Sequence, residues 1–212
     1  MTTDLPTGGV PASPAHERID RTVLVIGAGA AGARAAIELA ERGIEDVLVL
    51  GKRSHGDAHT TWARGGVNGA LGTHDPEDSP AIHAADTLKE GHFLNDPKKV
   101  ERVAWDAPKR LRELDDWGME FSRTDEGEID QRYFGAQSFR RTAFAGDHTG
   151  ESMLTTLVER AQELDIPYRE NVLITKLLSD GSRVHGALGY DMDDGTFLLI
   201  NAGAVVLAAG GY

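Results

Sequence analysis

The feature that most constrains the fold is a glycine-rich turn that joins a short apolar run to a helical pattern. Residues 22–26 read Thr-Val-Leu-Val-Ile, which is typical of a strand buried on both faces of a parallel sheet. The run Gly27-Ala-Gly-Ala-Ala-Gly32 follows at once, and residues 33–42 are rich in strong helix formers. A second apolar run at 46–50 completes a βαβ unit. The sequence therefore predicts an α/β, Rossmann-like fold with a parallel sheet.

This turn has the residues that a bound dinucleotide requires. The first glycine permits a tight turn, the second lets the backbone approach a pyrophosphate, and the third lets the helix pack closely on the strand. The helix N-terminus then offers unpaired N–H groups and the positive end of its dipole to the phosphates. Between a strand and a helix, the pattern favours dinucleotide binding over a purely structural turn. The residues expected at the dinucleotide are Gly27, Ala28, Gly29, Ala30, Ala31 and Gly32.

The second strand ends without the acidic residue that an NAD site usually has. In the common fingerprint, Asp or Glu about twenty residues after the turn holds the ribose. This strand ends Leu50-Gly51-Lys52, and a lysine has the wrong charge for that role. The pattern therefore argues against a nicotinamide dinucleotide.

The rest of the chain alternates helical and extended patterns within one expected domain. Residues 1–20 carry three prolines and read as a flexible lead, and the domain is expected at 21–212. A helical insert is predicted at 79–90 and 96–118, where Pro108 should break or kink the second helix. The elements expected after it are a hairpin-like stretch at 119–135 with a turn near 126–127, a helix at 149–164, a three-stranded β-meander at 172–178, 184–190 and 196–200, and a buried strand at 204–209.

Composition argues against several classes of function. Asp and Glu number 34 against 22 Lys and Arg, and the resulting net charge of −12 argues against a general binder of nucleic acid or anionic membrane. The chain has no cysteine, which excludes disulfides, thiolate metal sites and cysteine-ligated iron–sulfur clusters within it. Its longest apolar runs are far shorter than a bilayer span. We expect a cytoplasmic protein without direct membrane insertion, which would reach the inner membrane face only through partner subunits.

The run after the second strand resembles a known family. Lys52 is followed after six residues by His59-Thr60, and then by the pair Gly65-Gly66. This spacing resembles the flavoprotein subunits of succinate dehydrogenase and fumarate reductase, and their relative L-aspartate oxidase.

Later segments resemble the same family in the same order. Residues 122–127 and 131–135 are similar to its stretch between the helical insert and the next flavin contact. Residues 141–150 resemble its Arg-Thr-x-Phe-Ala-Ala-Asp-x-Thr-Gly segment, and residues 205–211 resemble its strand ending in Ala-Thr-Gly-Gly. Several motifs in order make the resemblance specific across residues 22–212.

The resemblance implies an FAD-binding domain of an FAD-dependent oxidoreductase that passes hydride between a C4 dicarboxylate and the flavin. It implies that His59 bonds covalently to the flavin ring, as in the respiratory members, and that Asp147 contacts the FAD. It also implies a small dicarboxylate substrate and an iron–sulfur partner subunit. The other residues expected at the cofactor are Gly51, Lys52, Thr60, Arg64, Gly65, Gly66, Val172 and Gly210.

Two positions depart from the family pattern, and part of the family's machinery lies elsewhere. Arg64 stands where the family has Gln or Glu, and Gly51 replaces the usual Ser and so removes a hydroxyl contact. The family carries its proton-donating arginine and its dicarboxylate-binding residues in a capping domain inserted after the strand that ends this chain. We therefore expect an incomplete fold and no catalytic acid or base in this chain.

Two other functions stay open at this stage. L-Aspartate oxidase, an enzyme of NAD biosynthesis, usually has a small polar residue in place of His59, so the histidine favours the respiratory type. A non-catalytic FAD-binding fragment that needs a second polypeptide is the other. A metal site at His55, Asp57 and His59 is the weaker interpretation of that stretch, because two glycines and no helical pattern surround the three residues.

Overall fold

The computed structural model describes residues 15–211 as a mixed sheet, a small second sheet and four main helices. The strands are β1 His16–Ile26, β2 Val47–Leu50, β3 Val67–Asn68, β4 Gln131–Arg132, β5 Thr142–Ala143, β6 Tyr168–Arg169, β7 Val172–Ser179, β8 Val184–Asp191 and β9 Phe197–Leu207. The helices are α1 Ala30–Glu41, α2 Pro80–Glu90, α3 Pro97–Asp116 and α4 Thr149–Glu163, with a short 3₁₀ helix, η1, at His59–Trp62.

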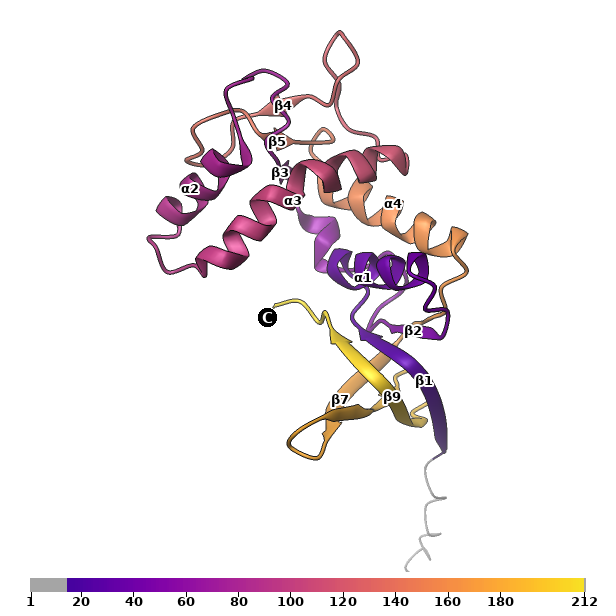
Figure 1. Cartoon of the computed structure of the whole chain (residues 1–212). Coiled ribbons are helices and arrows are strands. Elements are labelled where there is room, and N and C mark those ends of the chain that lie inside the picture. The colour runs from indigo at the N-terminus through magenta and orange to yellow at the C-terminus, as the bar shows by residue number, and fades with distance from the viewer. Residues whose placement is uncertain (1–14, 212) are drawn as a thin grey trace, which may run out of the picture.

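The large sheet has the strand order β6-β2-β1-β9-β8-β7. The first four strands are parallel, as expected, and β7, β8 and β9 form the expected antiparallel meander. Because the meander continues the parallel strands through β9, the two parts make one mixed sheet. Figure 1 shows α1 and α4 between this sheet and the helical insert of α2 and α3. The strand order reverses between β1 and β9, which is where α/β folds of this kind place ligands.

The last four residues of β1 and all of β2 are buried on both faces, as the apolar runs predicted. Val23, Val25, Val47 and Val49 pack with Ala36 of α1 on one face. The alternate residues of both strands join a second cluster that includes residues of β7, β8 and β9. Because side chains alternate along a strand, an uninterrupted Val/Leu/Ile run can serve both faces at once.

The first strand begins earlier than the sequence pattern indicated. The expected lead at 1–20 lies outside the described residues up to residue 14, but residues 16–20 belong to β1, so that part of the prediction is wrong. His16 pairs with Phe197 and the parallel register runs on to Ile26 with Leu207. Only Ile19 is buried in the first four residues of the strand, so charged neighbours hid its extended pattern.

The two strands expected near the end of the chain are one strand. The third meander strand at 196–200 and the buried strand at 204–209 merge into β9, whose first residues pair with β8 and whose full length pairs with β1. Gly203 lies inside β9, where an added Cβ would stand only 3.0 Å from the Thr22 carbonyl oxygen, so glycine lets β1 and β9 approach closely. The burial expected at 204–209 is wrong, because none of these residues is buried and Leu207 is 64% exposed.

The helical insert follows its capping signals. Ser79 caps α2 by accepting from the Ile82 N–H, and Pro80 begins the helix. In α3 the helix runs through Pro108, so of the expected break or kink the break is wrong, and the kink stays a prediction. The proline removes one backbone hydrogen bond, and burial of Ala104 and Leu111 on either side stabilises the continuous helix.

Two further elements agree with the sequence prediction. The stretch at 119–135 forms a hairpin-like turn closed by a bridge between Arg123 and Ile129, with Gly127 at φ +89°. The helix expected at 149–164 is α4. Within residues 15–211, no helix has the length and apolar character that crossing a membrane requires.

Candidate functional site

The glycine turn is fixed between the carboxyl ends of two strands. Gly27 has φ +107°, and an added Cβ would overlap the carbonyl oxygen of Ala208. The Gly27 N–H donates to the Leu50 carbonyl at 2.9 Å, and the Ala208 N–H donates to the Ile26 carbonyl at 2.8 Å. A Cβ at Gly32 would in turn overlap the Gly27 carbonyl. These two glycines are therefore needed for the fold of the turn itself.

Gly29 has a different role from its neighbours in the motif. It is the N-cap residue of α1, with the ordinary extended angles φ −74° and ψ −174°. An added Cβ would meet the Thr60 Oγ1 at 3.2 Å and no backbone atom within 4 Å among the nearest atoms. The same Thr60 oxygen accepts from the Ala30 N–H at 3.1 Å, whereas the N-cap residue Gly29 has no side chain that could cap the helix. A glycine at this position therefore keeps space open beside the N-terminus of α1.

A cavity of about 430 Å³ opens in front of this turn. It lies at the carboxyl ends of β1, β2, β6 and β9. Lys52, Arg53 and Asp57 are charged residues that line it. Asp57 pairs with Arg53 at 3.4 Å, so Lys52 is the positive charge among the three that this pair does not neutralise. The predicted site residues that line it are Gly27, Ala28, Gly29, Ala30, Ala31, Gly51, Lys52, His59, Thr60 and Gly210.

The other predicted site residues lie away from this cavity. Gly32 and Val172 contact residues that line the cavity. Gly32 packs on Gly27, and the N–H of the buried Val172 donates to the Gly51 carbonyl at 2.9 Å. The four others, Arg64, Gly65, Gly66 and Asp147, follow η1 or precede α4.

Those four residues form a second group. Arg64 donates through Nη1 to the Asp147 carbonyl at 2.9 Å, and the Asp147 side chain is 96% exposed. Gly65 leaves room for the ring of Phe134, and Gly66, at φ +124°, packs on the Ala143 carbonyl. Their contact with a cofactor stays a prediction.

Tyr168 is a wall residue that the sequence reasoning missed. Its hydroxyl donates to the Arg53 carbonyl at 2.8 Å, and its ring stacks on His55 with centroids 4.0 Å apart. Burial, with the charges of Glu170 and Asp57, raises the pKa of this tyrosine to about 12, so it stays protonated. A Cβ at Gly51 would overlap the Tyr168 hydroxyl, which explains glycine where the family usually has serine. Tyr168 was missed because its strand, β6, has only two residues after Pro167 and so shows no periodicity in the sequence.

The segment η1 places His59 at the cavity. Its carboxyl-terminal side packs on the start of α4: the Gly150 N–H donates to the Ala63 carbonyl at 2.8 Å, and a Cβ at Gly150 would overlap the Thr60 carbonyl. His59 begins the segment with an exposed side chain on the cavity wall. The described residues contain no group of three or more His, Asp or Glu side chains that could hold a metal ion.

Arg140 and Arg141 belong to the framework rather than to this cavity. Arg140 pairs with Asp75, and its hydrogen bonds lower the pKa of that carboxyl from 3.8 to about 2. Arg141 is 1% exposed and donates to Asp78 at 3.0 and 2.7 Å. Neither side chain lines the cavity at the glycine turn.

Comparison with known proteins covers nearly the whole chain. Residues 22–212 match the family model described as an FAD binding domain. The chain is 42% identical over 189 residues to a fumarate reductase (CoM/CoB) subunit of Methanothermobacter marburgensis, covering 89% of this chain and 35% of that protein. It is 35% identical over 205 residues to a succinate dehydrogenase flavoprotein subunit of Rickettsia bellii, covering 93% of this chain and 34% of that protein. The chain thus spans about a third of the length of these relatives.

Solved structures share the fold closely. Mycobacterium smegmatis Sdh1 in complex with UQ1 matches with a TM-score of 0.87 at 40% identity, over 92% of this chain and 34% of that one. An E. coli quinol fumarate reductase matches with a TM-score of 0.87 at 31% identity, over 92% of this chain and 33% of that one. The chain therefore belongs to the FAD-binding domain family of the succinate dehydrogenase and fumarate reductase flavoproteins.

Proposed function

We propose that this chain supplies the FAD-binding part of an oxidoreductase that passes hydride between a C4 dicarboxylate and the flavin. The single observation that carries the proposal is the match to relatives named as fumarate reductase and succinate dehydrogenase, at 42% and 35% identity along nine-tenths of the chain. Because the chain covers about a third of those proteins, the substrate and the activity are proposed for the protein that contains it.

The residues at the glycine turn fit the phosphate part of FAD. The N-terminus of α1 faces the cavity, residues 27–31 carry only glycine or alanine side chains, and the Thr60 hydroxyl accepts from the Ala30 N–H beside them. Lys52 adds a cationic side chain on the same wall, where an NAD site would have a carboxylate. A helix N-terminus with an unpaired cation nearby stabilises bound phosphate oxygens.

When bound, FAD supplies a ring that accepts or donates hydride. The chain's own residues would bind and orient it: the glycine turn would hold the phosphates, and His59 would be the residue that carries the covalent link to the ring. An exposed imidazole at the cavity wall is available for such a bond, whereas a buried one would already be committed to packing. A partner subunit with iron–sulfur clusters would receive the electrons, in keeping with relatives that are named as subunits.

The experiment is an assay of the longer protein that contains this chain. Reduction of fumarate by a reduced dye, and oxidation of succinate and of L-aspartate by an artificial acceptor, are measured side by side. We expect turnover with succinate or fumarate and none with L-aspartate. Turnover of L-aspartate alone would replace the proposal with L-aspartate oxidase.

The covalent bond has its own test in the same protein. After denaturation in acid, the unmodified protein should show a fluorescent flavin band on a gel. His59→Ser should lose the band and keep tightly bound FAD, and His55→Ser serves as the control that keeps it. A band that persists in His59→Ser would assign the bond to another residue.

A further inference from the structure

The helix α1 begins without a capping side chain on its own N-cap residue. The first backbone bond inside it runs from the Ala33 N–H to the Gly29 carbonyl at 3.0 Å, so the N–H groups of residues 30–32 lie ahead of the helical bonds. Ser, Thr, Asp or Asn at the N-cap usually accepts from one of these groups, but this helix has Gly29 there. A Cβ on Gly29 would stand 3.2 Å from the Thr60 Oγ1, so a capping side chain would take up space beside the cavity.

Thr60 supplies the missing acceptor from a different segment. Its Oγ1 accepts from the Ala30 N–H at 3.1 Å in a partly buried bond, although the two residues are 30 positions apart in the sequence. The threonine hydroxyl therefore acts on α1 as the side chain of an N-cap residue would. It takes only the first of the N–H groups of residues 30–32.

The short helix η1 is also bonded on its other side. The Gly150 N–H at the start of α4 donates to the Ala63 carbonyl at 2.8 Å, and a Cβ on Gly150 would overlap the Thr60 carbonyl. Ile37 of α1 and Leu157 of α4 belong to the same buried cluster. The segment η1 is thus bonded to the first turns of two helices that pack in one core, so it can shift only if one of these bonds breaks.

We propose that Thr60 is a positioning residue that joins the two parts of the cofactor site. Its hydroxyl ties η1 to the first turn of α1, and so it holds His59 at one place relative to the glycine turn. The inference rests on the proposed function, in which the turn binds the phosphates of FAD and His59 carries the link to the ring. A hydroxyl on residue 60 rather than on residue 29 caps the helix and keeps the space for the pyrophosphate free.

The first test is amide hydrogen exchange of the purified chain, followed by NMR without any ligand. Thr60→Val removes the acceptor and keeps the shape of the side chain. We expect the N–H groups of Ala30 and Ala63, which donate to the Thr60 hydroxyl and carbonyl, to exchange at least about fivefold faster, because loss of the cap lets this region open more often. Thr60→Ser keeps the hydroxyl, so its exchange should stay within about twofold of the unmodified chain.

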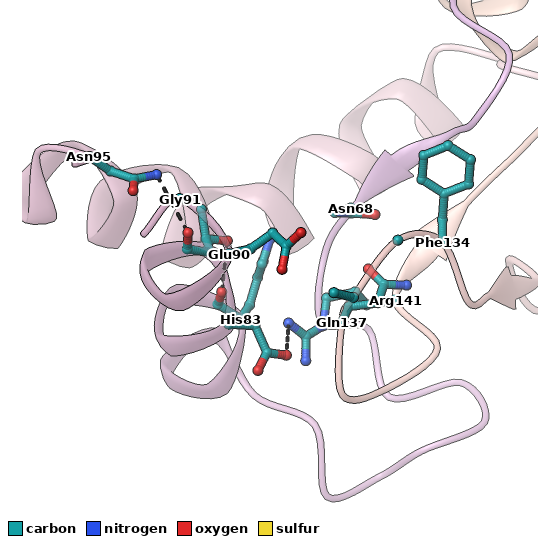
Figure 2. A pocket seen from close by; sticks show the side chains of 12 residues that line it. Asn68, His83, Glu90, Gly91, Asn95, Phe134, Gln137 and Arg141 are labelled. Carbon is teal, nitrogen blue, oxygen red and sulfur yellow. Dashed lines mark hydrogen bonds and ion pairs between the residues drawn. The ribbon is translucent and has the colours of Figure 1, made fainter. Parts of the chain in front are cut away.

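The matched control is Ser79→Ala, which removes the cap of α2. The Ser79 Oγ accepts from the Ile82 N–H at 3.3 Å, so this variant and Thr60→Val lose the same kind of bond, and each should lower Tm by about 2–4 °C. The helix α2 borders a different cavity, around which Figure 2 shows His83 and Glu90, and the lining residues of the two cavities differ. Ser79→Ala should therefore leave the exchange of both N–H groups at Thr60 unchanged.

The second test measures the link to the ring in the longer protein that contains this chain. FAD is added to the protein without its cofactor, and the growth of the fluorescent flavin band on a gel is followed in time. We expect Thr60→Val to slow this growth at least about tenfold, because misplacing a reacting group costs rate steeply, and Thr60→Ser to restore it. In a His59→Ser background, where that bond cannot form, Thr60→Val should change the affinity for FAD by less than about threefold.

Four results would overturn the proposal. They are unchanged exchange at Ala63 in Thr60→Val, an equal increase there in Ser79→Ala, unchanged growth of the flavin band, and a loss of FAD affinity as large as the loss of rate, which would make Thr60 a ligand of the phosphates. Absence of the band in the unmodified protein would instead refute the covalent bond of the proposed function. The exchange measurement needs no flavin, so it still decides whether Thr60 joins the two segments.

Discussion

Replacement of Gly29 separates binding by the glycine turn from its folding. Gly29 has ordinary extended angles, and an added Cβ would meet only the Thr60 Oγ1, at 3.2 Å, and the Ala58 Cβ, at 3.5 Å. Alanine is a poorer N-cap than glycine, but it also reduces the entropy of the unfolded chain, so we expect the free energy of unfolding of Gly29→Ala to change by less than about 1 kcal/mol. For a chain of this length that corresponds to a shift in Tm of at most about 4 °C.

Binding of FAD should respond far more strongly. A side chain at Gly29 occupies the space between the backbone and the pyrophosphate, so at least one charge-assisted hydrogen bond of about 1.5–3 kcal/mol is lost. We expect Gly29→Val to weaken FAD binding by at least about 100-fold, equivalent to about 2.7 kcal/mol. The assay is equilibrium dialysis against FAD, with circular dichroism as the measure of folding.

The matched control is Gly27→Ala in the same turn. Its positive φ and its overlap with the Ala208 carbonyl should lower the free energy of unfolding by several kcal/mol, so this variant fails in folding rather than in binding alone. A folded Gly29→Val protein that binds FAD as tightly as the unmodified chain would refute the assignment of this turn to the pyrophosphate.

Three further predictions concern the cavity wall, acid stability and catalysis. Gly51→Ala should lower the Tm of the unmodified chain by roughly 2–10 °C, because overpacking against Tyr168 costs about 1–3 kcal/mol. In a Tyr168→Leu background the same substitution should lower the Tm by less. An equal loss in both backgrounds would contradict the contact between the two residues. Asp75 has its pKa lowered from 3.8 to about 2, so its contribution to stability is present above pH 3.8 and is lost as the pH falls toward 2. Urea unfolding of Asp75→Asn should therefore depend less on pH in that window, and an unchanged pH dependence would dismiss the ion pair with Arg140. The 212-residue chain alone should not turn over succinate, fumarate or L-aspartate, because by resemblance the proton donor lies in a capping domain; turnover with an artificial acceptor comparable to that of the longer protein would place the active site within this chain.

Local signals predicted the parts of the fold that depend on neighbouring residues. The glycine turn, α1 and β2 follow from residues 22–50, and α2 follows from its cap at Ser79 and its first-turn Pro80. Each of these patterns depends on backbone angles or burial within a few residues, so it is visible without knowledge of the partner strand.

Apart from the helix that continues through Pro108, the misses depend on residues far apart in the chain. The start of β1 is stabilised by β9, which lies about 180 residues later, and the merger of two expected strands into β9 requires β1 to pass close to Gly203. Tyr168 reaches the candidate site through β6, whose partner is β2. A short strand of this kind has no periodicity, so only the three-dimensional fold brings its tyrosine beneath Gly51.

Calorimetric titration of the purified chain with FAD and, separately, with NAD tests the central claim most directly. The account predicts saturable binding of FAD at one site and no saturation by NAD at the same concentrations. The physical reason is the N-terminus of α1 with Lys52 in the cavity at the glycine turn, where an NAD site would carry a ribose-binding carboxylate. Saturable binding of NAD with no uptake of FAD would contradict the account.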